Sequence, residues 1–194
     1  MIKREIYYFE DFGEQNTEQT IEAAKKAALN LDVKYVVVAT ASGATGVKAA
    51  EVFKGTGMKV VVVTEYAGMA EFKDENRRQL EELGAAVITS THSFLSPAES
   101  ISKLHTGYCS ENTIIKDVLR RFSQGAKVAA EIVMMATDAG VIPISEEVIS
   151  IAGTGKGADT AMVLKSCHSD DFFHKERGME FREIIAMPRK KKFW

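Results

Sequence analysis

The chain contains 194 residues, of which 45% are hydrophobic and 27% are charged. This is the composition of an ordinary globular protein, and the length suits one domain, so we expect residues 1–194 to form a single domain. Its 25 basic and 27 acidic residues leave a net charge of −2, which gives no electrostatic reason to expect nucleic acid or an anionic membrane as a partner.

Strands and helices are expected to alternate in the first third of the chain. A helix can begin at Asn16 or Thr17, since either residue can act as its cap and apolar residues then recur at helical spacing. The apolar run Tyr35–Ala39 predicts a strand that is buried on both faces. After a glycine-bearing turn, the pattern predicts a helix over residues 47–53 and a strand over residues 60–64.

The rest of the chain continues the alternation. The next predicted elements are a charged helix ended by Gly84 and a short strand, over residues 73–83 and 86–89. Residues 97–140 are expected to be mostly helical, with breaks near Gly107 and Gly125. Three further strands are predicted over residues 148–152, 161–165 and 182–187.

This order of elements predicts a three-layer α/β/α fold with a mostly parallel sheet and one antiparallel strand near the C-terminus. In such sheets, ligands bind outside the carboxyl ends of the strands. Four loops are therefore candidates for ligand binding, at residues 40–46, 65–72, 90–100 and 153–160.

The turn of residues 40–46 has the composition of a phosphate cradle. It lies between a buried strand and a helix, whose first backbone N–H groups are unpaired and carry about half a positive charge. The turn offers hydroxyls at Thr40, Ser42 and Thr45 and small residues at Gly43, Ala44 and Gly46. Together these features favour phosphate, although a capped turn without a ligand would have the same composition.

The loop of residues 153–160 is the second candidate phosphate site. Three glycines allow close approach to the backbone, and Lys156 can meet a phosphate as a point charge. The members of this predicted site are Gly153, Thr154, Gly155, Lys156, Gly157, Asp159 and Thr160. The loop is not a Walker A motif, because Ser150 stands where that motif needs glycine and Gly157 where it needs Ser or Thr. A flexible hairpin connection is the alternative interpretation.

The run Val-Val-Val-Ala-Thr-Ala-Ser-Gly-Ala-Thr-Gly from Val36, followed by a helix and Lys-Val-Val-Val-Val-Thr, resembles the C-terminal α/β domain of pyruvate kinase. In that family a Thr-x-Ser-Gly-x-Thr turn holds a phosphate of a sugar bisphosphate effector. Residues 148–166 are similar to the hairpin that closes the same site, here with a shorter loop. The resemblance implies phosphate contacts from Thr40, Ser42, Gly43 and Thr45, and from Gly155, Lys156 and Gly157. Since the catalytic (β/α)8 barrel of pyruvate kinase has no counterpart in this sequence, we expect no pyruvate kinase activity.

The whole chain more closely resembles a small archaeal family of stand-alone proteins built on this α/β domain. That resemblance implies a bound flavin mononucleotide (FMN). Phe94, beside His92, offers an aromatic ring for stacking on a flavin, and Met69 in the Gly68-Met69 turn offers packing for its other face.

Two further classes of function remain open from the residues. Residues 41–46 form a degenerate Gly-x-Gly-x-x-Gly motif without its first glycine, and Glu65 ends the next strand, which makes an NAD(P)-binding enzyme an alternative. A non-catalytic module that senses a sugar phosphate is another. No nucleophile, proton donor or hydride site can be named from the residues, so the sequence does not decide whether the protein is an enzyme.

The remaining predictions concern metals, location and assembly. The four histidines show no metal-ligand spacing, so no metal is predicted. No apolar leader opens the chain, and residues 128–142 are interrupted by Glu131 and Asp138 and are too short to cross a bilayer. The two cysteines form no Cys-x-x-Cys pair, which favours reduced thiols and a cytoplasmic location. A homo-oligomer is not excluded.

Overall fold

One sheet organises the molecule. The computed structural model describes residues 1–69, 71–95, 97–105, 107 and 109–193, so positions 70 and 96 of the candidate loops lie outside the described residues. The strands lie in the order β1-β7-β6-β5-β2-β3-β4. They are β1 (Tyr7–Phe9), β2 (Tyr35–Ala39), β3 (Lys59–Thr64), β4 (Ala86–Thr89), β5 (Glu147–Ala152), β6 (Thr160–Lys165) and β7 (Glu180–Pro188). Strand β6 runs antiparallel to β5 and β7, and the other neighbouring pairs are parallel, which confirms the predicted mostly parallel sheet.

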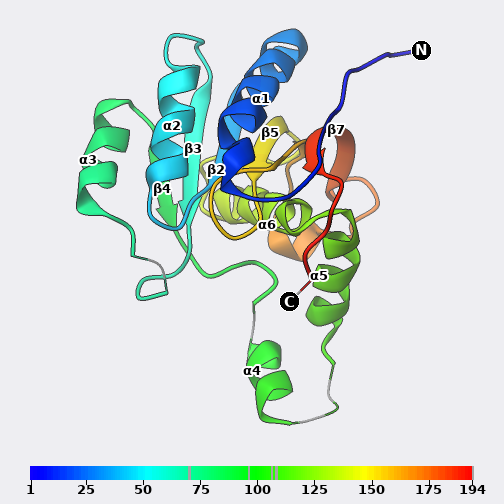
Figure 1. Ribbon diagram of the computed structural model, residues 1–194. Helices are drawn as coiled ribbons and strands as arrows, with labels where there is room; N and C mark the ends of the chain where they lie inside the picture. Colours follow the sequence, from blue (N-terminus) through cyan, green and yellow to red (C-terminus); the bar gives the residue numbers. More distant parts are fainter. Residues whose placement is uncertain (70, 96, 106, 108, 194) are drawn as a thin grey trace.

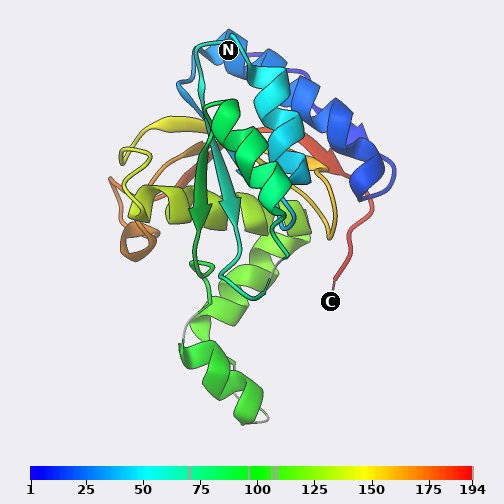
Figure 2. The same ribbon diagram turned by 90° about the vertical axis from the view of Figure 1, so that its left-hand side faces the viewer.

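Helices cover both faces of the sheet and complete the predicted three-layer fold (Figures 1 and 2). Helices α1, α2 and α3 lie side by side on one face, α6 lies on the other, and α5 packs against α6. The α-helices are α1 (Thr17–Leu31), α2 (Ala44–Phe53), α3 (Asp74–Glu82), α4 (Pro97–Leu104), α5 (Glu111–Phe122) and α6 (Gln124–Asp138). Helix α4 projects away from the sheet, and two 3₁₀ turns are formed by Glu14–Asn16 and Ser169–Asp171.

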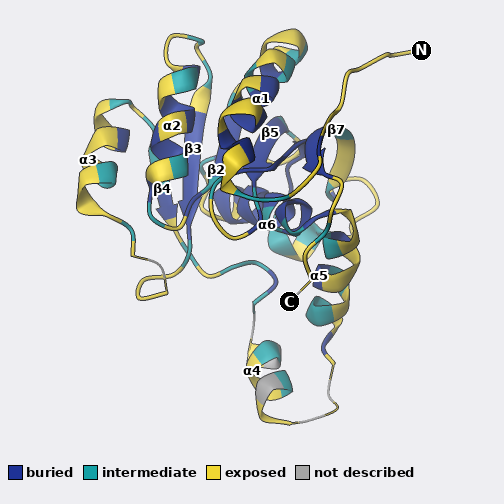
Figure 3. Cartoon of the chain, viewed as in Figure 1, coloured by how far each residue is buried: buried dark blue, intermediate teal, exposed yellow. Residues whose placement is uncertain are grey.

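The central strands β2, β3, β5 and β6 are buried on both faces, as their continuous apolar runs predict. Val36 and Val38 of β2 belong to the core under α1 and α2, whereas Val37 between them belongs to the core under α6. Figure 3 shows the central strands as buried and the outward helix faces as exposed. Among the described residues, no helix is both long enough and apolar enough to cross a membrane.

Several element boundaries differ from the sequence-based prediction. Helix α2 begins at Ala44 and not at residue 47, so Thr45 lies in its first turn. The break predicted near Gly125 is confirmed and falls at Ser123, whose hydroxyl caps α6 by accepting from the backbone N–H of Ala126. Asn16 flanks α1 without a side-chain cap and instead donates its side-chain amide to the carbonyl of Asp11. The edge strand β1 was not predicted.

The topology brings the two candidate phosphate loops together. Strands β2 and β5 are parallel neighbours, with Tyr35 opposite Val148 and Val38 opposite Ile151. Their carboxyl ends therefore lie side by side at one edge of the sheet. The turn after β2 and the loop after β5 leave from that edge, as the sequence predicts.

Candidate functional site

A cavity of about 730 Å³ lies at this edge of the sheet. The turn after β2, the loops after β3 and β4, helices α5 and α6 and the loop after β5 all contribute to its walls. The apolar lining includes Val128, Ile132 and Met135 of α6. The charged lining comprises five cations, Lys73, Lys116, Arg120, Lys127 and Lys156, and three carboxylates, Glu14, Glu65 and Glu131.

The turn after β2 presents the N-terminus of α2 to the cavity. Gly43 has a φ of 96°, a left-handed conformation that favours glycine, and a Cβ there would lie 2.6 Å from Asn76 Cβ. The side-chain amide of Asn76 donates to the carbonyl of Ser42 at 2.8 Å, and the hydroxyl of Thr40 accepts from the N–H of Gly43 at 3.0 Å. These contacts hold the turn so that Ser42, Ala44 and Thr45 line the cavity.

The loop after β5 faces this turn and is fixed from beneath. The buried carboxylate of Asp159 accepts hydrogen bonds from the N–H of Gly13 at 3.0 Å, the N–H of Thr154 at 3.2 Å and the hydroxyl of Thr160 at 2.8 Å. Gly153, Gly155, Lys156 and Gly157 are left to line the cavity. Lys156 is exposed and makes no ion pair with any described residue, so its ammonium is available to an anion.

Helices α5 and α6 supply buried cations. Lys116 is 7% exposed, and its Nζ lies 2.7 Å from Glu99 Oε2 in α4. Burial raises the pKa of Glu99, but hydrogen bonds from Lys116, Thr113 and Ser110 outweigh it and lower the pKa to about 2. A carboxylate with so low a pKa remains ionised, so Glu99 holds Lys116 at the cavity wall at neutral pH.

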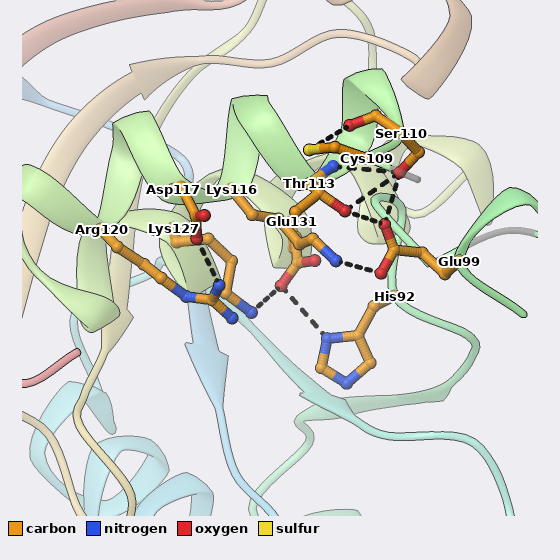
Figure 4. A network of polar contacts seen from close by, with 10 residues as sticks. All are labelled: His92, Glu99, Cys109, Ser110, Thr113, Lys116, Asp117, Arg120, Lys127 and Glu131. Atoms are coloured by element: carbon orange, nitrogen blue, oxygen red, sulfur yellow. Dashed lines mark hydrogen bonds and ion pairs between the residues drawn. The ribbon is translucent and has the colours of Figure 1, made fainter. Parts of the chain in front are cut away.

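A second buried pair lies one helix further on (Figure 4). Glu131 Oε2 accepts from Lys127 Nζ at 2.6 Å and lies 3.1 Å from His92 Nδ1. Burial raises the pKa of Glu131, but the hydrogen bond from His92 and the charge of Lys127 more than compensate, so the pKa is lowered. On its other side, His92 Nε2 lies 3.5 Å from Glu65 Oε1.

The structure places the sequence-predicted residues in two groups. Those that line the cavity are Thr40, Ser42, Ala44, Thr45, Glu65, Met69, His92, Gly153, Gly155, Lys156 and Gly157. Those that do not are Gly43, Gly46, Gly68, Phe94, Thr154, Asp159 and Thr160. Phe94 is 4% exposed and packs edge-on against Phe172, so in this structure its ring is not available for stacking on a ligand in the cavity.

The α5–α6 side of the cavity was missed from the sequence. Its polar residues are Lys116, Arg120, Gln124, Lys127 and Glu131. A signal was present, because Lys127 and Glu131 stand one helical turn apart in a helix that is otherwise almost entirely apolar, and buried charges are rare unless they are paired. Within the described ranges, no three His, Cys, Asp or Glu side chains gather as a metal-ion site would require.

Comparison with known proteins identifies the fold family. The pyruvate kinase alpha/beta domain family matches residues 18–164, which is most of the chain. The chain belongs to the pyruvate kinase alpha/beta domain family. The matched region contains the turn after β2, helices α5 and α6 and the loop after β5, so all the residues that line the cavity except Glu14 lie within it.

The matches among solved structures include much longer proteins. A pyruvate kinase from Cryptosporidium parvum is 14% identical, with a TM-score of 0.41 over 77% of this chain and 22% of that chain. The structure of the Cryptosporidium parvum pyruvate kinase in complex with ADP gives 15% identity and a TM-score of 0.41, over 77% and 23% of the two chains. An O-ureido-L-serine synthase is 14% identical, with a TM-score of 0.32 over 64% and 37%. The chain therefore spans less than a quarter of the length of these pyruvate kinases.

Proposed function

We propose that this pyruvate kinase alpha/beta domain binds a phosphorylated small molecule in the cavity at the carboxyl edge of its sheet, and that FMN is that ligand. The phosphate would lie between the N-terminus of α2 and Lys156. The observation that carries the proposal is the convergence of these two groups from strands that are neighbours in the sheet but distant in the sequence.

The chemistry of the two loops supports an anion. The first N–H groups of a helix are unpaired and attract negative charge. The hydroxyl of Thr45 makes no hydrogen bond to a described residue, and the ammonium of Lys156 has no carboxylate partner among them. Both are therefore available to one phosphate without the loss of an existing bond.

The cavity wall supports a ligand that extends beyond its phosphate. A volume of about 730 Å³ lies within the range of small-molecule and cofactor sites. Its apolar side chains on α6 suit a planar or aliphatic group. The proposal assigns no reaction to the site.

The test measures affinities for FMN, riboflavin and inorganic phosphate by titration calorimetry, with Thr45→Val, Lys156→Ala and the double variant. Since a hydrogen bond to a charged group is worth about 1.5–3 kcal/mol, each single variant should weaken FMN binding by roughly ten- to 150-fold. Because both groups contact one phosphate, their effects should be coupled by at least about 0.5 kcal/mol. Riboflavin, which has no phosphate, should bind weakly and respond to neither variant.

Lys190→Ala is the control, because Lys190 is exposed and pairs with Asp11 outside the cavity. It should leave all three affinities unchanged. Equal affinity of the wild-type protein for FMN and riboflavin, or strict additivity of the two variants, would contradict the proposed phosphate site.

A further inference from the structure

Four ionisable side chains form a continuous relay in the cavity wall. It runs from Lys127 through Glu131 and His92 to Glu65, with successive contacts of 2.6 Å, 3.1 Å and 3.5 Å. Two members come from α6, His92 follows β4 and Glu65 follows β3. The relay is deeply placed, because the Glu131 side chain is 1% exposed and the His92 side chain 15%.

The relay is incomplete in the protein alone. Nε2 of His92 and Oε1 of Glu131 are buried and have no hydrogen-bond partner among the described residues. Buried polar atoms are almost always hydrogen-bonded, and an exception calls for an explanation such as a water, an ion or a functional role. Both atoms belong to residues that line the cavity, so a ligand that fills the cavity is a candidate partner.

The protonation of the relay defines what that partner must be. The lowered pKa of Glu131 keeps it a carboxylate, which can only accept a hydrogen bond, so His92 carries a proton on Nδ1. In a neutral imidazole Nε2 is then an acceptor, whereas in an imidazolium it would donate to Glu65 Oε1, 3.5 Å away. The neutral form therefore leaves two acceptors facing one another, and it needs a hydrogen-bond donor at this point.

We infer that His92 is a ligand-contacting residue that accepts a hydrogen bond through Nε2 from a hydroxyl or ring N–H of the ligand. Glu131, held by Lys127, is the positioning residue that fixes the tautomer. This inference rests on the proposed function, because it concerns the part of the same ligand that carries no phosphate. Strands lie about 4.8 Å apart, and β4 is two strands from β2, so the donor group lies roughly 10 Å along the sheet edge from the phosphate.

The direct test is nitrogen NMR on protein labelled with ¹⁵N-histidine. The chain has four histidines, and the His92 signals are assigned by their absence in His92→Gln. The free protein should show the Nδ1–H tautomer at His92. FMN and riboflavin should shift the Nε2 resonance, whereas inorganic phosphate should leave it in place. A His92 spectrum that is unchanged at saturating FMN, or that phosphate alone shifts equally, would overturn the inference.

Two replacements of His92 separate ligand contact from a merely structural role. The amide of Asn lies near the position of Nδ1 and can still donate to Glu131, whereas the longer Gln can reach the position of Nε2. If Nε2 contacts the ligand, His92→Asn should weaken FMN binding by about tenfold, the effect of one lost hydrogen bond, and His92→Gln should retain part of it. If His92→Asn bound FMN with the same affinity as the wild-type protein, His92 would contact Glu131 but not the ligand.

Glu131→Gln tests the positioning role, since the amide keeps the shape of the side chain but no longer enforces the Nδ1–H tautomer. It should lower the affinities for FMN and riboflavin by the same factor and leave that for phosphate unchanged. His168→Gln is the matched control for His92→Gln. His168 Nδ1 also lies 3.1 Å from a carboxylate, that of Asp138, but His168 does not line the cavity.

The measurements with inorganic phosphate distinguish the failure of this inference from the failure of the proposed function. If FMN binds and phosphate competes with it, but the His92 resonances do not shift, then the proposed function stands and this inference fails. If neither flavin binds but phosphate does, the phosphate site stands while the choice of FMN and this inference both fail.

Discussion

The hydroxyl of Thr17 accepts a hydrogen bond from the backbone N–H of Ala158 at 3.0 Å, which joins the first turn of α1 to the loop after β5. The same hydroxyl donates to the carbonyl of Glu14 at 2.6 Å. The loop that carries Lys156 is therefore docked on a helix from the other end of the chain. Its position in the cavity depends on that docking as much as on its own glycines.

Replacing Gly157 by alanine should disrupt this docking. Gly157 has a φ of +70°, and a Cβ there would lie 2.3 Å from Thr17 Oγ1 and 2.7 Å from Glu14 Cα. Gly155→Ala is the matched control, because Gly155 has a φ of +79° but a Cβ there meets nothing within 4 Å. We expect about 1–2 kcal/mol of backbone strain from either variant and a larger loss only for Gly157→Ala, measured by urea denaturation. Equal losses would mean that Thr17 does not constrain the loop.

Replacing one member of the buried pair of Lys127 and Glu131 should lower the free energy of unfolding more than replacing both. Lys127→Met leaves the carboxylate of Glu131 in the core without its cation, and such uncompensated buried charges cost about 3–5 kcal/mol of unfolding free energy. Adding Glu131→Leu removes the second charge, so the double variant should be more stable than Lys127→Met alone. Lys26→Met, which breaks an exposed pair with Glu5, should change stability little. A double variant no more stable than Lys127→Met would contradict this account.

The attachment of α4 to α5 should depend on pH through Glu99. Its pKa is lowered from an ordinary 4.5 to about 2, so its contribution to stability is complete above pH 4.5 and is lost as the pH falls through about 2. The difference in unfolding free energy between wild type and Glu99→Gln should therefore shrink over that interval. Denaturation curves at several pH values within it provide the measurement, and a constant difference would show that Lys116 does not stabilise the ionised form.

The two cysteines should differ in reactivity. Cys109 is exposed, whereas Cys167 is buried, and burial together with the nearby charges of Asp138 and Asp171 raises the pKa of its thiol to about 11. Since the thiolate is the reactive form, a disulfide reagent at about pH 8 should modify one thiol in the native protein and both in denaturant. Rapid modification of both thiols in native protein would indicate that the core around Cys167 opens readily.

Much of the fold could be predicted from the sequence because the strands are continuous apolar runs. Runs such as Tyr35–Ala39 can be buried on both faces only in a sheet covered on two sides, which specifies the layers. The strand β1 was missed because Tyr7 and Tyr8 are partly exposed and only Phe9 is buried, so three residues carry almost no pattern. The start of α2 was placed too late because its first turn consists of small and polar residues, which helices and loops use equally.

The candidate site was only half predictable. Glycines and hydroxyls after two strands indicated the end of the cavity where we propose that phosphate binds, since those residue types are needed there by local geometry. The other end is built from side chains on α5 and α6, and which face of a helix meets a cavity depends on packing that one sequence does not reveal. Phe94 is an example. The sequence placed its ring at the edge of the sheet where the ligand was expected, but the ring packs edge-on against Phe172.

The reversed direction of β6 has a consequence for how this cavity can change. The loop with Lys156 joins two adjacent antiparallel strands, so residues inserted beside Gly155, where a Cβ meets nothing within 4 Å, need not displace a helix. A residue inserted in the turn after β2 would displace α2. We therefore expect insertions beside Gly155 to be tolerated more readily than insertions in the turn after β2, and the shape of the cavity to be easier to change from that side.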